Sequence, residues 1–432
     1  MTNSIFWHRR DLRIEDNAGL YKACTKSEAV QPVFIFDTQI LSELEPNDAR
    51  VEFIHEQIER LATEYKNLGV CLQVEIGNPT EIIPRLAAEL NVDTVVTNRD
   101  YEPYALQRDK HIHELLKAQG IEFIGAKDHV VFEKNEVVKA DGLPYTVFTP
   151  YSRKWKEALS QHPIQSYDSV ASLRSVKGIA MEKPIPTLLQ LGFTPSGISF
   201  PTTRVEDLLI EKYSDQRNFP AIPGTSKLGL HLRFGTLSIR KLVMRACGLN
   251  ETFLNELIWR EFYQMIIFHF PHTVTKAFKP AYDAIVWENN PKDFQRWCEG
   301  TTGYPLVDAG MRELNATGFM HNRVRMVTAS FLTKHLLIDW RQGEAYFAKK
   351  LLDFELASNV GGWQWAAGSG TDAAPYFRVF NPTAQQEKFD PKFAYVKRWV
   401  PEFGTPAYPK PIVEHSFARN RILERYKSAL NP

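Results

Sequence analysis

The sequence lacks the long apolar segments that place a protein in or across a membrane. No apolar run reaches the roughly 20 residues of a membrane-spanning helix. The first residues, MTNSIFWHRRDLR, carry charges where a signal peptide would be hydrophobic. We therefore expect a cytoplasmic protein without membrane segments.

Cysteine is scarce and neither sign of charge dominates. The four cysteines, Cys24, Cys71, Cys247 and Cys298, show no metal or redox spacing, which favours free thiols in a reducing compartment. With 52 basic and 51 acidic residues the net charge is +1, so any site for a polyanion must be a local patch. The histidines form no metal-ligand pattern, and no serine or cysteine has a nucleophile context. We expect no metal site.

What the sequence does contain is enough apolar residues for large cores. The chain has 432 residues, of which 44% are hydrophobic, and this length suits two or three domains. The first third alternates apolar segments with helical patterns, which favours a doubly wound parallel sheet. No G-x-G-x-x-G turn supports a dinucleotide site there. Strands are predicted at 4–8, 31–37, 69–77, 92–98 and 121–132, with a helix over 48–69.

The pattern changes from about Tyr145 onward. Helical periodicity at 145–162 is followed by a stretch rich in Pro, Gly and Ser at 182–204, which is typical of an extended linker. Beyond Val205 the periodicity is almost entirely helical. We therefore predict an α/β domain over 1–132, a helical segment and linker over 133–204, and a large all-helical domain over 205–432. The clearest helical segments are 238–247, 254–270, 305–318, 320–340 and 343–358.

Two helical segments combine polar and aromatic residues on one face. Glu256, Trp259, Arg260 and Tyr263 are spaced i, i+3, i+4 and i+7, so a helix places them together. This set is unusual for a core, although an amphipathic helix with a surface Arg–Glu pair would also explain it. In MHNRVRM, Asn322, Arg325 and Met326 are similarly spaced, and they suit a polar planar ligand packed against a thioether. The alternative there is an ordinary helix end with surface arginines.

A small-residue turn precedes another helical pattern. Gly224, Thr225 and Ser226 open this pattern, and free N–H groups at such a helix start bind phosphate. Lys227 and Arg233 would add positive charge. Helix-capping by Thr or Ser is common, however, so the turn has an equally simple structural interpretation.

Trp363 and Trp365 lie two residues apart, directly after Gly361 and Gly362. On a helix each residue turns about 100°, so the two indoles point to nearly opposite sides. The glycines leave space for a flat group to approach the backbone. A buried helix end with two core tryptophans is the alternative.

Taken together, five motifs are similar to those of the photolyase/cryptochrome family, and most like the class I cyclobutane pyrimidine dimer photolyases. They occur in the order FWHRRDLRIEDN, NELIWREFY, GYPLVDAGMREL, MHNRVRMVTASFL and GGWQWAAGSGTDAAPYFRVFNP, and the resemblance covers almost the whole chain. It implies an N-terminal α/β antenna domain and a C-terminal all-α domain that binds FAD.

The resemblance also implies roles for individual residues. The resemblance implies that Trp363 faces the flavin and that Trp365 faces the lesion. The catalytic positions that match are Glu256, Asn359, Trp363, Trp340 and Trp287. Those that match cofactor-binding positions are Tyr213, Thr225, Ser226, Lys227, Leu228, Gly229, Arg325, Asp353, Phe354, Glu355 and Asn359, with Lys227 and Gly229 standing where some relatives have Arg and Ser. The DNA- and lesion-binding set is Arg217, Glu256, Trp259, Arg260, Tyr263, Asn322, Arg323, Met326, Trp365 and Gln385.

The function implied is light-dependent repair of cyclobutane pyrimidine dimers in ultraviolet-damaged DNA by a monomer. An electron would pass from excited reduced FAD to a flipped-out dimer. The alternative is a cryptochrome-like blue-light photoreceptor that binds FAD without repair. Tyr104 and Ala105 depart from the Asn-Glu of folate-binding relatives, so the antenna chromophore stays open between a deazaflavin, a flavin, a folate and none.

Overall fold

The computed structural model describes residues 2–180, 183–373 and 375–430, which form two compact units interleaved along the chain. Glu182, the first residue of the expected linker, lies outside the described residues. The first unit comprises Met1–Glu136, Glu157–Thr203 and Leu228–Arg245, and the second comprises Val137–Lys156, Arg204–Lys227 and Ala246–Pro432.

The first unit contains the predicted parallel sheet. Its strands run in the order β3-β2-β1-β4-β5, every pairing is parallel, and β6 (Lys177–Gly178) pairs with β2. Three strands, β3, β4 and β5, are shorter than expected. Beyond Ala126 the chain leaves the sheet, and the buried Asp128 accepts hydrogen bonds from Arg13 and Arg240 instead. The strands are β1 (Asn3–His8), β2 (Ala29–Asp37), β3 (Gln73–Gly77), β4 (Thr94–Asn98) and β5 (Glu122–Ala126).

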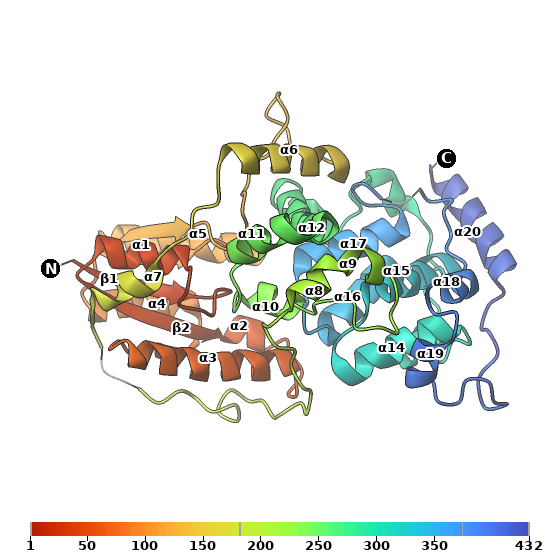
Figure 1. Ribbon diagram of the computed structural model, residues 1–432, viewed down its shortest axis with the longest axis horizontal. Helices are drawn as coiled ribbons and strands as arrows, with labels where there is room; N and C mark the ends of the chain where they lie inside the picture. Colours follow the sequence, from red (N-terminus) through yellow and green to blue (C-terminus); the bar gives the residue numbers. More distant parts are fainter. Residues whose placement is uncertain (1, 181–182, 374, 431–432) are drawn as a thin grey trace. The chain divides into compact units, whose positions relative to one another are not determined.

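Helices cover both faces of this sheet, as Figure 1 shows. Ile5 and Trp7 of β1 pack in one cluster with residues of α4 and α5, whereas His8 points to the other face and bonds Tyr65 of α3 at 2.7 Å. Asp48 caps α3, as predicted, by accepting from the Arg50 N–H. The helices of this unit are α1 (Ala18–Lys26), α2 (Thr38–Leu41), α3 (Ala49–Asn67), α4 (Pro79–Glu89), α5 (Pro103–Ala118), α7 (Ser169–Arg174) and α10 (Gly229–Phe234).

The described part of the second unit is helical, apart from one isolated β-bridge between Val138 and Pro144. Two helices, α6 (Phe148–Gln161) and α11 (Ile239–Leu249), contribute residues to both units. The longer helices are α12 (Glu251–His269), α13 (Pro291–Glu299), α14 (Pro305–Thr317), α15 (Asn322–Ser330), α16 (Trp340–Lys350), α17 (Leu356–Ala367), α18 (Pro382–Phe389) and α20 (His415–Leu430). Shorter ones are α8 (Asp207–Glu211), α9 (Tyr213–Gln216), α19 (Ala394–Trp399) and the 3₁₀ turns η1 (Pro271–Val274) and η2 (Pro280–Ala284).

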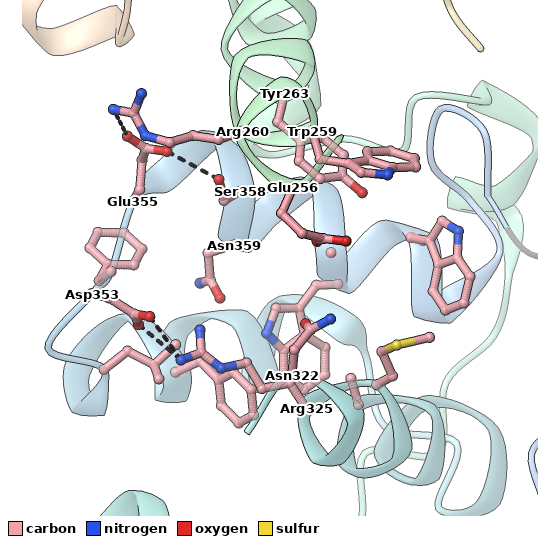
Figure 2. Close-up of a pocket in the computed structure, with 18 of the residues that line it drawn as sticks. Glu256, Trp259, Arg260, Tyr263, Asn322, Arg325, Asp353, Glu355, Ser358 and Asn359 are labelled. Carbon is pink, nitrogen blue, oxygen red and sulfur yellow. Dashed lines mark hydrogen bonds and ion pairs between the residues drawn. The ribbon is translucent and has the colours of Figure 1, made fainter. Parts of the chain in front are cut away.

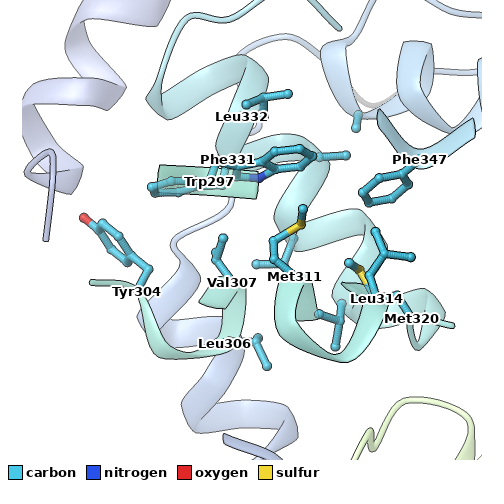
Figure 3. Close-up of a cluster of buried hydrophobic side chains, with 14 of the residues drawn as sticks. Trp297, Tyr304, Leu306, Val307, Met311, Leu314, Met320, Phe331, Leu332 and Phe347 are labelled. Atoms are coloured by element: carbon cyan, nitrogen blue, oxygen red, sulfur yellow. The ribbon is translucent and has the colours of Figure 1, made fainter. Parts of the chain in front are cut away.

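The core of this unit is an aromatic and aliphatic cluster centred on Trp297 (Figure 3). Trp297 is fully buried and stacks on Phe347, with ring centroids 5.9 Å apart. Helices α14 and α15 approach closely because Gly310 has no side chain: a Cβ there would come within 2.3 Å of Val324. Trp363 and Trp340 belong to the same cluster.

Two helices predicted as continuous are interrupted. The 320–340 segment forms α15, then the π-helical turn η3 (Phe331–His335), and α16 starts only at Trp340, where Asp339 caps it. The 343–358 segment is broken at 351–355. Ion pairs of Asp353 and Glu355, described below, hold the chain out of the helix there.

The predicted helix start at Gly224–Ser226 is wrong. The next helix, α10, begins at Gly229, and no side chain caps it. Lys227 lies between them with a left-handed backbone, φ +52°, which interrupts any helix that starts earlier. Thr225 and Ser226 therefore lie outside a helix.

No helix in the described ranges combines the length and the apolar character needed to cross a membrane.

Candidate active site

A cavity of about 390 Å³ opens within the second unit (Figure 2), a size usual for small-molecule sites. Helices α12, α15 and α17 and the interruption at 351–355 supply most of its wall, and Arg217 and Phe347 of α16 complete it. Sequence-predicted residues that line it are Arg217, Glu256, Trp259, Arg260, Tyr263, Asn322, Arg325, Met326, Asp353, Phe354, Glu355, Asn359, Trp363 and Trp365.

The predicted face of α12 is the face that lines the cavity. Glu256, Trp259, Arg260 and Tyr263 all contribute, so this is not a solvated amphipathic surface. Tyr263 lies against α17 because Gly361 has no side chain: a Cβ there would come within 2.3 Å of the phenol ring. The helix with the polar and aromatic face is thereby held close to the helix with the two tryptophans.

Trp363 and Trp365 both line the cavity but pack against different neighbours. Trp363 is 2% exposed and contacts Phe347, with ring centroids 5.0 Å apart. Trp365 instead packs near Phe380, at 6.3 Å. The two-residue spacing therefore directs the indoles to separate parts of the site.

Two ion pairs fix charged groups along the interrupted segment (Figure 2). Arg260 donates to Glu355 at 2.9 Å, and the Ser358 hydroxyl donates to the other carboxylate oxygen at 3.1 Å. Arg325 donates to both oxygens of Asp353, at 3.1 and 2.9 Å. Since each guanidinium has a carboxylate partner, the charges along this wall are balanced in pairs.

Glu256 points into the cavity (Figure 2) and is paired with Arg217. Burial raises the pKa of the Glu256 carboxyl, and the Arg217 guanidinium opposes this shift. The charge of the Glu256 carboxyl therefore depends on the Arg217 guanidinium.

Asn359 is oriented by a neighbouring acid. Its amide nitrogen donates to the Glu344 carbonyl at 3.1 Å and to the Glu344 carboxylate at 2.8 Å. Burial raises the pKa of Glu344, and the Asn359 N–H acts in the opposite direction. The structure therefore assigns the amide nitrogen of Asn359 to Glu344.

Helix α15 begins at the cavity with a histidine cap. The His321 ring accepts a hydrogen bond from the Arg323 N–H at 3.1 Å. Burial, together with the charges of Arg325 and Arg323, lowers the pKa of His321 to about 4. The cap is consequently a neutral acceptor, and it places Asn322 and Met326 on the cavity wall.

Other predicted site residues do not line the cavity. Trp340 belongs to the apolar cluster of Trp363, and Trp287 packs against that cluster. Leu228 and Gly229 fall in the first unit. The remaining predicted residues outside the lining are Tyr213, Thr225, Ser226, Lys227, Arg323 and Gln385.

Five lining residues were not among the predicted site residues: Ala329, Phe347, Leu351, Ser358 and Gly362. From the sequence, Gly362 is expected only to leave space beside the tryptophans. A Cβ on it would meet nothing within 4 Å. Ser358 follows Glu355 by three residues, a spacing that could have indicated its contact. The three apolar residues carry no signal that distinguishes them from core.

Family models match most of both units. Residues 4–168 match the DNA photolyase model, and residues 253–406 match the FAD-binding domain of DNA photolyase. The deoxyribodipyrimidine photo-lyase of Synechococcus sp. is 36% identical, over 98% of this chain and 96% of the relative. That of Halobacterium salinarum is also 36% identical, over 98% and 99%.

Solved structures agree with this assignment. A class III photolyase from Agrobacterium tumefaciens superposes with a TM-score of 0.86 at 32% identity, over 100% of this chain and 98% of the other. A Sulfolobus tokodaii photolyase with two FAD molecules gives 0.85 at 34%, over 99% and 100%. A Synechocystis cryptochrome gives 0.85 at 25%, over 98% and 99%. The chain belongs to the DNA photolyase/cryptochrome family, and its helical unit carries the FAD-binding domain of that family.

Proposed function

We propose that this protein repairs cyclobutane pyrimidine dimers in DNA by light-driven electron transfer. The observation that carries the proposal is the presence of the Glu256 carboxyl in one cavity with the indoles of Trp259 and Trp365. Such a set suits two stacked bases with polar carbonyl edges. Close relatives bear the name deoxyribodipyrimidine photo-lyase, which supports the same substrate class.

The inner part of the cavity fits a flavin. The buried indole N–H of Trp363 has no hydrogen-bond partner among the residues that the structure describes. Beside it lie Asn359 and the Arg325–Asp353 pair, which offer polar and charged groups to a heteroaromatic ring. When bound, reduced FAD supplies the light-absorbing centre and the electron for the lesion.

The chain's own residues receive and hold the lesion. Flipping a dimer out of the duplex costs a few kcal/mol, and less where the damage has already disturbed stacking. Stacking on an aromatic wall returns about 1–3 kcal/mol per base. Trp259 and Trp365 are the walls, and Glu256 is placed to hydrogen-bond a base carbonyl edge as negative charge develops there.

DNA is the proposed partner, bound outside the cavity through phosphate contacts. Asn322 and Arg217 lie on the cavity wall, while Arg323 and Gln385 lie beyond it. Arg323 donates to Asn218 at 2.7 Å and stacks over Phe389 at 4.3 Å, so its guanidinium is held in place. A local group of basic residues of this kind is consistent with a net charge of only +1.

A photoreceptor function is the second candidate, because a Synechocystis cryptochrome shares the fold at 25% identity. That function needs FAD but no lesion pocket. The presence of Glu256, Trp259 and Trp365 in the cavity favours repair. Assignment to class I and the identity of any antenna chromophore stay predictions, since a class III photolyase shares the fold with a TM-score of 0.86.

The test is light-dependent loss of dimers from ultraviolet-treated oligo(dT) with the reduced holoenzyme. We expect repair under blue light and none in the dark. Absence of repair, with FAD bound and reduced, would reject the proposal in favour of the photoreceptor.

A further inference from the structure

The indole of Trp259 is stacked face to face on a residue from a distant part of the chain. Phe148, the first residue of α6, lies with its ring centroid 3.8 Å from that of Trp259 and its plane tilted by only 4°. Phe148 is itself 8% exposed and does not line the cavity. One face of the indole is therefore covered by a buried ring.

The other two ring neighbours of Trp259, Phe262 and Tyr263, do not stack on it face to face. Phe262 meets the indole edge-on, at 5.5 Å and 83°, and Tyr263 is tilted against it at 5.4 Å and 35°. Phe262 also meets Phe148 edge-on, at 5.9 Å and 80°. Because Trp259 lines the cavity and Phe148 does not, we take the face opposite Phe148 as the one available to a stacked base.

Phe148 is anchored through its own backbone. Its N–H donates to the Asp372 carboxylate at 3.1 Å, and the Thr371 hydroxyl donates to the Thr146 carbonyl at 2.7 Å. Asp372 has a left-handed backbone, φ +45°, which is uncommon for a residue other than glycine. Two bonds thus tie the segment that carries Phe148 to the segment that follows α17.

We propose that Phe148 is a positioning residue for lesion recognition, which fixes the plane of Trp259 so that its free face is ready for the flipped dimer. A tryptophan held in one orientation loses less side-chain freedom when a base stacks on it, so binding is tighter. This inference rests on the proposed repair function and adds a residue outside the cavity to it.

The prediction differs from that for an ordinary core residue. If Phe148 acts through Trp259, its removal must matter only while Trp259 is present. If Phe148 only stabilises the fold, its removal should affect damaged and undamaged DNA alike, with or without the indole. A double-mutant cycle separates these two cases.

The experiment measures dissociation constants of the holoenzyme in the dark, for oligo(dT) with one dimer and for undamaged oligo(dT). Phe148→Ala and Phe148→Leu should each reduce the preference for damaged DNA by about 2- to 10-fold, the range for an aromatic pair. Binding to undamaged DNA should not change. Phe148→Tyr should retain the preference, because it keeps the stacked ring. Flavin absorption checks that each variant is folded and loaded.

In the Trp259→Ala background, adding Phe148→Ala should produce no further loss of preference. A further loss of similar size, or an unchanged preference in both Phe148→Ala and Phe148→Leu, would overturn the inference. A wild-type protein without any preference for the dimer would instead refute the proposed repair function. The two failures are therefore distinguishable.

Discussion

The Asn359 side chain places both of its amide hydrogen bonds on one residue, Glu344, through the carbonyl at 3.1 Å and the carboxylate at 2.8 Å. An amide held in this way presents its oxygen, an acceptor, to the cavity. A reduced flavin carries more ring N–H groups than an oxidised one. The Glu344–Asn359 contact should therefore favour the reduced cofactor.

The first prediction concerns this contact. Glu344→Leu removes the carboxylate acceptor and leaves only the backbone carbonyl to hold the Asn359 amide. This loss should lower the reduction potential of bound FAD by roughly 10–30 mV, the equivalent of one ordinary hydrogen bond. Glu344→Gln keeps an acceptor oxygen and should give a potential closer to wild type. Spectroelectrochemical titration of the holoenzymes measures both. Equal potentials in the two variants would show that the Glu344 carboxylate does not orient Asn359.

A second prediction follows from the pairing of Arg217 with Glu256. Glu256→Gln should release the guanidinium and tighten binding to undamaged DNA by up to about fivefold, the value of a partly exposed ion pair. Glu251→Gln makes the same change in net charge on the same helix and is the control, since Glu251 pairs with Lys156 instead.

The salt dependence of DNA binding tests the same ion pair through its other member, Arg217. If Arg217 moves to a phosphate when DNA binds, Arg217→Ala should flatten the plot of log K against log salt by roughly one unit. An unchanged slope would keep Arg217 as an internal partner of Glu256 only.

The sequence predicts the residues that line the site better than the long-range contacts that hold them in place. The spacing of Glu256, Trp259, Arg260 and Tyr263 predicts one helical face, and local geometry suffices for that. The interruption at 351–355 could not be predicted, because carboxylates in it bind arginines that lie far away in the sequence.

Hydrophobic periodicity also could not predict contacts between segments that lie far apart in the sequence. The stacking of Phe148 on Trp259 joins two segments that no local rule connects. The strand predicted at 121–132 is present but ends early for a similar reason, since beyond Ala126 the ion pairs of Asp128 replace the regular ladder.

The third prediction concerns the tryptophans. Trp363→Phe should block light-driven reduction of oxidised FAD while largely preserving repair by chemically reduced enzyme, because electrons would enter through the cluster shared by Trp363 and Trp340. Absorption changes under illumination measure the first activity, and dimer loss from oligo(dT) measures the second. If both activities fell equally, the indole would have a structural role.

The same indole can be displaced without replacing it. Gly343→Ala should place a Cβ within 2.1 Å of the Trp363 ring, so the ring must move and photoreduction should slow. Gly248→Ala is the matched control in another helix, because a Cβ there meets nothing within 4 Å and Ala is the better helix former. Comparable photoreduction rates in the two variants would contradict the assignment.

The last prediction concerns Lys334, a buried lysine in the π-helical turn η3. Its side chain is 1% exposed and donates to the Arg378 carbonyl at 2.9 Å. Burial, with a smaller contribution from the Arg378 charge, lowers the pKa of Lys334 from 10.5 to about 8. Between these pH values the unfolded chain keeps a proton that the folded chain has released. The free energy of unfolding therefore rises with pH across this window.

Lys334→Met has no group that titrates at this position. The free energy of unfolding of the wild type, minus that of the variant, should increase by about 3 kcal/mol as the pH rises from 8 to 10.5. Below pH 8 the difference should be constant, since both states of the wild type then carry the charge. Urea unfolding of the two proteins at matched pH measures the difference, and groups common to both cancel. A difference that does not change with pH would mean that Lys334 keeps its ordinary pKa, and that the turn at Phe331–His335 opens enough to hydrate the ammonium.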